Sequence, residues 1–180
     1  QILECQPFKV ISFLQIFIMK KKHNFSITYS EYNSLNSLPK EDQVLLYKAI
    51  DVAKGAYAKY SDFQVGSAIQ LANGEQVVGS NQENAAYPSG LCAERVAIFS
   101  ASALYPNEQI NTIAIYAAKE LETDNPVSPC GACRQVLMEY ELKQEKPIRL
   151  LLLSAMGKVW EFEGVKELLP FAFKFKPLKK

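Results

Sequence analysis

Two cysteines in the stretch SPCGACRQVL, residues 128–137, constrain the fold of this chain more than any other feature. Cys130 and Cys133 are three positions apart at the head of an apolar-periodic run. We therefore expect both at the start of a helix and on one face of it. Ser128 can cap that helix, and Pro129 suits its first turn. Because the positive end of a helix favours thiolates, this pair can chelate one soft or borderline cation.

Cys92, in LCAER, opens a second predicted helix and supplies a third thiolate. Three protein ligands with the fourth position open to water are the pattern of a catalytic zinc site, whereas structural zinc sites have four. A Cys-x-x-Cys pair alone also fits a redox dithiol or two small residues packed at a helix end, and Cys92 is what favours a metal. The remaining cysteine, Cys5, and the single histidine, His23, lie near the N-terminus, so a fourth protein ligand is hard to find.

Two charged residues follow Cys92 directly. A helical glutamate is usually a solvated surface group, but Glu94 stands in the apolar context CAERVAIF, beside the expected metal-bound water. It is our candidate general acid and base. Arg95 is three residues after Cys92 and can hydrogen-bond to thiolate sulfurs, which offsets the excess negative charge of three thiolates on one divalent ion. Arg134, next to Cys133, is a second candidate for that task.

Composition and net charge limit the binding partners and the cellular compartment that we expect for this chain. The chain has 180 residues, 48% of them hydrophobic and 22% charged, which suits one globular domain. Its formal net charge of +1 provides no basic field for nucleic acid or an anionic membrane, so we expect neither as a partner. Four cysteines without a secretory signal indicate a reducing compartment, and we expect a cytoplasmic protein with free thiols.

The N-terminal region is expected to lie outside the main domain. Its apolar run VISFLQIFIM is too short to span a bilayer, and the basic cluster KKK follows it, which is the reverse of a signal peptide. We interpret residues 1–18 as a non-native leader before Met19, within an N-terminal extension over residues 1–38. Residues 39–175 form the predicted domain, and residues 176–180 a basic tail.

Hydrophobic periodicity predicts helices and strands in alternation. We expect an α/β layered domain with a mixed sheet, because buried strand patterns alternate with helical ones. Residues 24–32 are either an extra strand or a loose arm, and Asn73-Gly74 signals a tight hairpin. The predicted helices cover residues 34–57, 90–104 and 130–142, with a short one over 165–173 stopped by Pro170, and the strands cover 63–71, 75–81, 110–118, 148–154 and 158–162.

Four ordered motifs carry a family resemblance: AYAKYSDFQVGSAI, GSNQENAAYPSGLCAER, SPCGACRQVL and LLPFAF. From Glu41 to about Phe173 the chain resembles the cytidine deaminase family. The resemblance implies a three-layer α/β/α sandwich around a five-stranded mixed sheet, assembled as a homotetramer. It implies one Zn²⁺ per chain on the three cysteines, a type of site known for zinc deaminases. Glu94 would then shuttle protons, and Arg95 would balance charge.

Substrate residues follow from the same motifs, by position. Without the resemblance, Phe63 would be read as core and Asn81 and Glu83 as ordinary turn residues. Two departures affect neighbouring segments: Lys59 stands where many relatives have proline, and Phe171 where a smaller residue is common. The resemblance implies that Phe63 packs on the pyrimidine, Asn81 and Glu83 hold ribose hydroxyls, the Ala93 amide contacts the base, and Tyr87 and Phe173 serve a neighbouring subunit's site.

The implied activity is zinc-dependent hydrolytic deamination of cytidine and deoxycytidine to uridine and deoxyuridine, with release of ammonia, in pyrimidine salvage. A polynucleotide deaminase is an alternative, but it needs a phosphate-binding surface and its relatives commonly have histidine where Cys92 stands. A deaminase of a cytosine-containing antibiotic is a second alternative, against which Asn81 and Glu83 favour a nucleoside. A non-enzymatic zinc-stabilised binding module predicts a fourth protein ligand.

Overall fold

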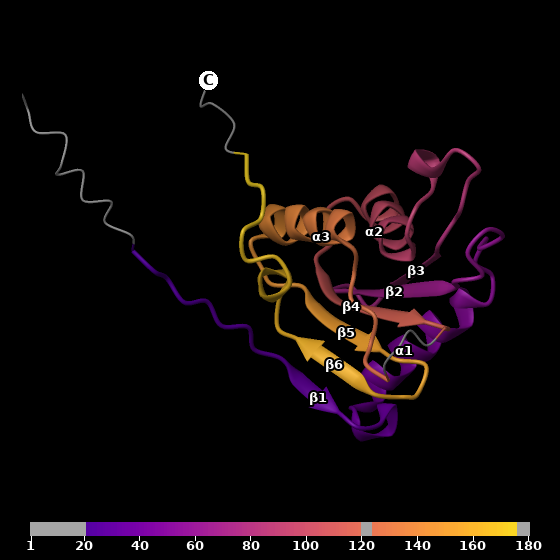
Figure 1. Ribbon diagram of the computed structural model, residues 1–180, viewed down its shortest axis with the longest axis horizontal. Coiled ribbons are helices and arrows are strands. Elements are labelled where there is room, and N and C mark those ends of the chain that lie inside the picture. The colour runs from indigo at the N-terminus through magenta and orange to yellow at the C-terminus, as the bar shows by residue number, and fades with distance from the viewer. Residues whose placement is uncertain (1–20, 120–123, 176–180) are drawn as a thin grey trace, which may run out of the picture.

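The computed structural model describes residues 21–119 and 124–175, which form a mixed sheet covered by helices on both faces (Figure 1). The strand order is β1-β6-β5-β4-β2-β3. β4 and β5 are parallel, and every other neighbouring pair is antiparallel. The strands are β1 (Ser30–Tyr32), β2 (Val65–Leu71), β3 (Gln76–Ser80), β4 (Ile110–Ala117), β5 (Arg149–Leu153) and β6 (Val159–Phe162).

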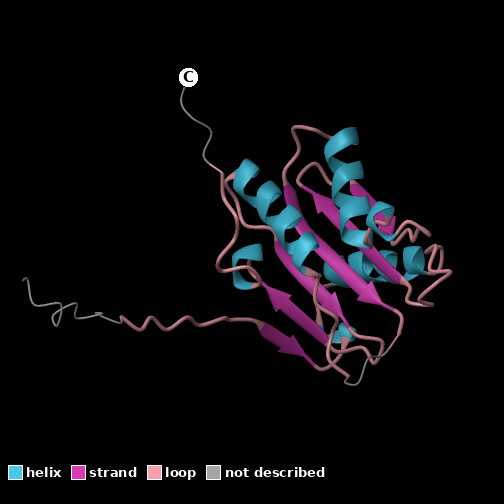
Figure 2. Ribbon diagram, turned by 45° about the horizontal axis from the view of Figure 1, so that its top comes forward, coloured by secondary structure: helices cyan, strands magenta, loops and turns pink. Residues whose placement is uncertain are grey.

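The sheet has six strands, whereas the family resemblance implied five. The additional strand is β1, which lies in the stretch predicted as either a strand or a loose arm. It pairs with β6, with Ser30 opposite Glu161. The Trp160 indole also donates to the Glu31 carboxylate, at 2.7 Å. Pairing thus continues one strand beyond β6, while residues 21–29 lead into β1 as an extended segment (Figure 2).

Three helices make the outer layers of the predicted three-layer arrangement. α1 (Lys40–Ala53) packs on one face of the sheet, and α2 (Ala93–Leu104) and α3 (Gly131–Gln144) pack on the other (Figure 1). Neighbouring residues of β4 enter opposite cores: Ile113 belongs to the α2–α3 side and Ala114 to the α1 side, and both are fully buried. This explains the nearly continuous apolar run, because a strand covered on both faces has no solvent side.

Two strand glycines let helices lie directly on the sheet. A Cβ on Gly79 of β3 would lie 2.5 Å from the Ala97 nitrogen and 2.8 Å from the Ala93 carbonyl oxygen. On the other face, a Cβ on Gly66 of β2 would lie 1.9 Å from the Ala49 carbonyl oxygen. No real side chain tolerates such distances, so these glycines set the depth of α1 and of the start of α2.

The chain path brings two helix N-termini to one end of the sheet. α2 leads into β4, and α3 leads into β5, on the same face. Because β4 and β5 run parallel, both helices begin at the end of the sheet where these strands finish. The predicted cysteine-bearing helix starts therefore meet.

Most predicted elements are confirmed, with different bounds. The first helix begins only at Lys40, after Pro39 at its N-cap, and a separate 3₁₀ turn (Leu35–Ser37) precedes it. The hairpin after β2 is confirmed, with Gly74 at φ 90°. The predicted C-terminal helix is shorter, a 3₁₀ turn over Val165–Glu167 that ends before Pro170.

Some predictions concern residues outside this description. The leader over residues 1–18, Cys5 and the basic tail at 176–180 lie outside the described residues, whereas His23 is described and exposed. Among the described helices, none has the length and apolar character needed to cross a membrane.

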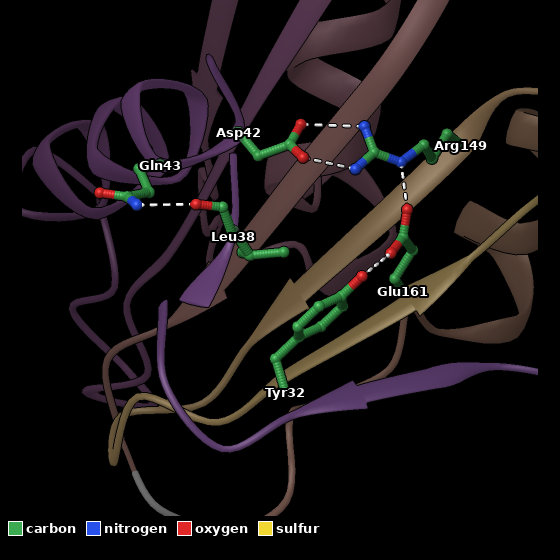
Figure 3. Close-up of polar contacts among 6 residues, drawn as sticks. All are labelled: Tyr32, Leu38, Asp42, Gln43, Arg149 and Glu161. Carbon is green, nitrogen blue, oxygen red and sulfur yellow. Dashed lines mark hydrogen bonds and ion pairs between the residues drawn. The ribbon is translucent and has the colours of Figure 1, made fainter. Parts of the chain in front are cut away.

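A partly buried polar network joins α1 to the strands β1, β5 and β6 (Figure 3). The Arg149 guanidinium on β5 makes two hydrogen bonds to the Asp42 carboxylate of α1 and a third to Glu161 of β6. The Tyr32 hydroxyl of β1 donates to Glu161 at 2.7 Å. Burial alone would raise the pKa of Glu161, but the hydrogen bonds from Tyr32 and Arg149 hold it below its ordinary value. The network thus fixes β1 and β6 to the domain.

Candidate metal centre and pocket

Three cysteines from two helices converge at the end of the sheet where α2 and α3 begin. The sulfur atoms of Cys92, Cys130 and Cys133 all lie within 4.8 Å of one another, and the Cys92 and Cys130 sulfurs are 3.9 Å apart. Cys133 is buried, Cys92 is half-buried and Cys130 is exposed. The cluster therefore has a closed side toward the core and an open side toward solvent.

The cysteines occupy the positions where a helix N-terminus needs acceptors. Cys92 is the N-cap of α2, Cys130 is the N-cap of α3, and Cys133 lies in the first turn of α3. The expectation that Ser128 caps this helix is wrong, because the helix begins at Gly131. The cap positions, where serine or aspartate is usual, thus place sulfur atoms in the positive field of two helix ends.

Hydrogen bonding within the cluster gives the two better-buried thiols, Cys92 and Cys133, very different pKa values. The pKa of Cys92 is lowered to about 5, first by the hydrogen bond from Cys133 and further by that from Arg95, although burial opposes the shift. The pKa of Cys133 is raised, because its proton is held in the hydrogen bond to Cys92 and because it is buried. A bound cation would remove this difference, since coordinating thiols are deprotonated outright.

Arg95 lies beside the cluster, as the sequence predicts. Its Nη2 is 3.7 Å from the Cys92 sulfur and 3.5 Å from the Gly90 carbonyl oxygen. Its Nε is buried and has no hydrogen-bond partner among the described residues. Arg134, the second candidate, donates instead to the backbone carbonyls of Pro129 and Leu168. Arg95 is therefore the guanidinium placed to offset thiolate charge, and Arg134 is a backbone brace.

Glu94 is buried, with 5% of its surface exposed, and it lines a pocket of about 180 Å³ beside the sulfurs. Its pKa is raised, first by burial and then by the charge of Cys92. A raised pKa makes this carboxyl group a better proton acceptor than an exposed glutamate, a property that suits proton transfer. The pocket is lined by Phe63, Val65, Asn81, Cys92, Glu94, Ile115, Ala117, Val127, Ser128 and Cys130.

Asn81 holds the chain on both sides of Gln64, directly after Phe63. Its Oδ1 accepts from the Val65 amide and its Nδ2 donates to the Phe63 carbonyl, each at 2.8 Å. The half-buried Phe63 side chain is part of the pocket lining. Asn81 thus has a clear structural task in addition to the substrate role that the resemblance implies.

Glu83 lies outside this lining and binds the turn before Phe63. Its carboxylate accepts from the amides of Tyr60 and Ser61 and from the Ser61 hydroxyl. These hydrogen bonds lower the pKa of Glu83, the one from the Ser61 hydroxyl most. Glu83 and Tyr87 both line a second pocket of about 270 Å³, which shares Asn81 and Cys92 with the first.

The remaining predicted substrate residues fall into two groups. Ala93 is the first residue of α2, so its amide has no partner within the helix and is available near the cysteines. Tyr87 and Phe173 are 79% and 73% exposed, and neither lines the pocket beside Glu94. Gln135 binds the backbone of Phe173 through two hydrogen bonds of 2.9 and 3.0 Å. The side chains of Tyr87 and Phe173 are thus mostly exposed to solvent and lie outside the pocket beside Glu94.

Sequence reasoning missed several residues of the pocket. Val127 and Ser128 enter it from the loop before α3, and Ile115 and Ala117 from the end of β4. The loop residues adjoin Cys130 in sequence, which is a usable signal. The β4 residues gave no such signal, because their apolar pattern is that of any buried strand.

The donor set fits a tetrahedral thiophilic cation. Three sulfurs within bonding reach of one ion, two helix N-termini and a nearby guanidinium with an unpaired Nε together suit three thiolates on a divalent metal. A buried carboxyl group, that of Glu94, lines the adjoining pocket. An α/β sandwich with this centre is the arrangement expected of a zinc-binding hydrolytic enzyme.

Comparison with known proteins specifies the family. Residues 39–145 match the family model described as the cytidine and deoxycytidylate deaminase zinc-binding region. A cytidine deaminase of Halalkalibacterium halodurans is 42% identical over 131 residues, which cover 73% of this chain and 92% of that protein. A cytidine deaminase of Sporosarcina psychrophila is 41% identical over 118 residues, which cover 66% of this chain and 80% of that protein. The chain belongs to the cytidine and deoxycytidylate deaminase family.

Solved structures agree with this assignment. The crystal structure of cytidine deaminase from Burkholderia pseudomallei matches with a TM-score of 0.63 at 35% identity, covering 76% of this chain and all of that one. The crystal structure of cytidine deaminase from Mycobacterium tuberculosis matches with a TM-score of 0.56 at 30% identity, and the match covers 73% of this chain and 96% of that one. The predicted α/β class and family are therefore confirmed, with one more strand in the sheet.

Proposed function

We propose that this chain catalyses the zinc-dependent hydrolytic deamination of cytidine and deoxycytidine to uridine and deoxyuridine, with release of ammonia. The observation that carries the proposal is the convergence of three cysteine sulfurs on a pocket lined by the buried Glu94. Family membership supports the same reaction. Cys92, Cys130 and Cys133 would hold the zinc ion, which when bound supplies a water molecule activated at neutral pH.

Glu94 is the proton carrier of the reaction. Its carboxylate accepts the proton released from the water and passes it to N3 of the cytosine ring, and a later transfer protonates the departing amine at carbon 4. Burial raises the pKa of Glu94, which makes it a stronger proton acceptor, and excludes bulk water from these transfers. Arg95 limits the negative charge of the thiolates, so that the metal remains an effective Lewis acid.

The pocket orients the substrate through several kinds of contact. Phe63 provides an apolar wall for the pyrimidine, and the free amide of Ala93 can donate to the base. Asn81 and Glu83 receive the ribose hydroxyls. An analogue lacking a hydroxyl leaves such a polar group unpaired, which makes this kind of contact selective.

The assembly we propose is a homotetramer whose subunits share their sites. Tyr87 and Phe173 expose most of their surface, as side chains that reach a neighbouring subunit would in an isolated chain. The reducing environment needed for three free thiols favours a cytoplasmic role in pyrimidine salvage. The near-neutral net charge of +1 supports a small nucleoside rather than a nucleic acid as substrate.

The test is ammonia release from purified protein. We expect one zinc per chain, turnover of free cytidine, and loss of turnover after chelation that returns with Zn²⁺. An oligonucleotide and a cytosine-containing antibiotic serve as competing substrates, and preference for either would redirect the proposal. A zinc-loaded protein inactive on all three would favour a binding module instead.

A further inference from the structure

Ser61 joins the lining of two adjoining pockets, because its hydroxyl group links Glu83 of one to the backbone of Phe63 of the other. The Phe63 amide donates to Ser61 Oγ at 3.0 Å, and Ser61 Oγ donates to Glu83 Oε1 at 2.5 Å. Because the amide uses a lone pair of the hydroxyl oxygen, the hydroxyl hydrogen is free to point at the carboxylate. One side chain therefore links Glu83 to the backbone that carries Phe63.

The remaining acceptor capacity of Glu83 can be counted. A carboxylate offers about four acceptor positions, two on each oxygen. Oε2 accepts from the amides of Tyr60 and Ser61, at 2.7 and 3.3 Å, and Oε1 accepts from the Ser61 hydroxyl. Among the described residues, these contacts leave a single acceptor position open, on Oε1.

Backbone geometry makes the link rigid. Asp62, between Ser61 and Phe63, has a φ of 55°, in the left-handed region that aspartate tolerates better than most residues. This conformation accompanies the turn in which the Phe63 amide meets Ser61 Oγ. Asn81 holds the Phe63 carbonyl from the other side. Phe63 is thus fixed at both its amide and its carbonyl group.

We propose that Ser61 is a positioning and specificity-determining residue, which leaves Glu83 one acceptor for a sugar hydroxyl and fixes that acceptor relative to Phe63. The inference rests on the proposed function, in which Glu83 receives a ribose hydroxyl and Phe63 contacts the base. Ser61 itself need not touch the substrate. It sets the separation between the sugar contact and the base contact.

The kinetic test compares cytidine with 2′,3′-dideoxycytidine, which lacks both sugar hydroxyls. We expect Ser61→Ala to raise KM for cytidine about tenfold, equivalent to about 1.4 kcal/mol, while kcat changes far less. The preference for cytidine over the dideoxy analogue should fall by a similar factor. Ser61→Thr, which keeps the hydroxyl, should recover most of the preference. Ser37→Ala, at an exposed serine of the turn before α1, is the matched control.

A second readout needs no substrate. Hydrogen exchange measured by mass spectrometry on the segment 57–65 should speed up in Ser61→Ala, at unchanged zinc content, and return toward wild type in Ser61→Thr. An unchanged preference between the two nucleosides, or unchanged exchange, would overturn the inference. Failure of the proposed function gives a different result. In that case the wild-type protein does not deaminate cytidine, but Ser61→Ala still speeds hydrogen exchange in the segment 57–65.

Discussion

The Arg95 guanidinium and the Cys92 sulfur lie 3.7 Å apart, one helical turn from each other at the start of α2. The same guanidinium has a buried Nε that finds no acceptor among the described residues. Cys92 in turn raises the pKa of Arg95, so the arginine stays charged. The pair therefore couples a permanent positive charge to a thiolate that we assign to the metal.

Replacing Arg95 should lower the catalytic rate without removing the metal, because Arg95 balances thiolate charge but is not a metal ligand in this proposal. In Arg95→Gln we expect bound zinc, because all three sulfurs remain, and a fall in kcat/KM of about 10- to 100-fold, the usual cost of losing a partner of a metal ligand. Zinc analysis and steady-state kinetics measure the two effects. Arg95→Lys should recover part of the rate. Full activity in Arg95→Gln would show that the thiolate charge needs no such partner.

Glu94→Gln tests the proton carrier. The amide has nearly the same shape but cannot accept and release a proton, so kcat should fall by about 10²- to 10⁴-fold while zinc and thermal stability are kept. Glu139→Gln, at an exposed position of α3, provides the control and should retain wild-type turnover. Near-normal turnover in Glu94→Gln would remove Glu94 from its assigned role.

Metal removal should destabilise the fold as well as stop turnover. An ion that binds only the folded chain stabilises it by about 4 kcal/mol when present at a thousand times its Kd. Chelation should therefore lower the Tm of the wild type. In Cys133→Ser, which loses a buried ligand, the Tm should already be below that of the wild type before chelation and should change little when chelator is added. Cys5→Ser should behave as wild type, and an equal response in all three proteins would contradict the three-cysteine site.

The network around Arg149 should control stability at acidic pH. Arg149→Met leaves Asp42 and Glu161 without their cation, and we expect the free energy of unfolding to fall by about 3 kcal/mol. The pKa of Glu161 is lower in the folded state than its ordinary 4.5, so its contribution is complete above pH 4.5 and is lost as the pH falls below that value.

Urea unfolding of the zinc-loaded protein at several pH values measures this effect. The wild type should lose stability below pH 4.5 more steeply than Arg149→Met. Lys54→Met, which removes an exposed ion pair with Asp51, should leave the unfolding midpoint almost unchanged. If Arg149→Met and Lys54→Met lost similar amounts of unfolding free energy, the network around Arg149 would contribute no more than an exposed ion pair.

Gly79→Ala should displace the start of α2. The added methyl would meet the Ala97 nitrogen at 2.5 Å, so the helix must shift, at a cost of about 1–3 kcal/mol. Cys92 precedes this helix directly, and zinc affinity should weaken together with stability. Gly55→Ala, whose new methyl would have an ordinary contact of 3.6 Å, is the control. Unchanged zinc affinity in Gly79→Ala would show that the cysteine positions do not depend on this packing.

Local chemistry explains what the sequence made predictable. The sulfur cluster could be inferred because Cys92, Cys130 and Cys133 each stand at a helix start, where both element type and charge are readable from a few residues. The α/β class followed from strand and helix periods, which differ strongly. Substrate roles for Asn81 and Glu83 required the family resemblance, since turn residues of these types are common.

Features that depend on distant pairings were not predictable in the same way. β1 has three residues and an ambiguous pattern, and its pairing with β6 depends on partners about 130 positions away, such as Tyr32 with Glu161. Ser61 gave no signal, because its task follows from the position of Glu83 in the folded chain.

The parallel alignment of β4 and β5 has a further consequence. It brings together residues 38 positions apart, Cys92 from one helix–strand unit and Cys130 from the next. An ion bound there would hold the starts of α2 and α3 together in the folded chain, and this stabilisation is lost when the ion is removed. We therefore expect the metal-free protein to open first along the seam between α2 and α3, with the sheet as the last part to unravel.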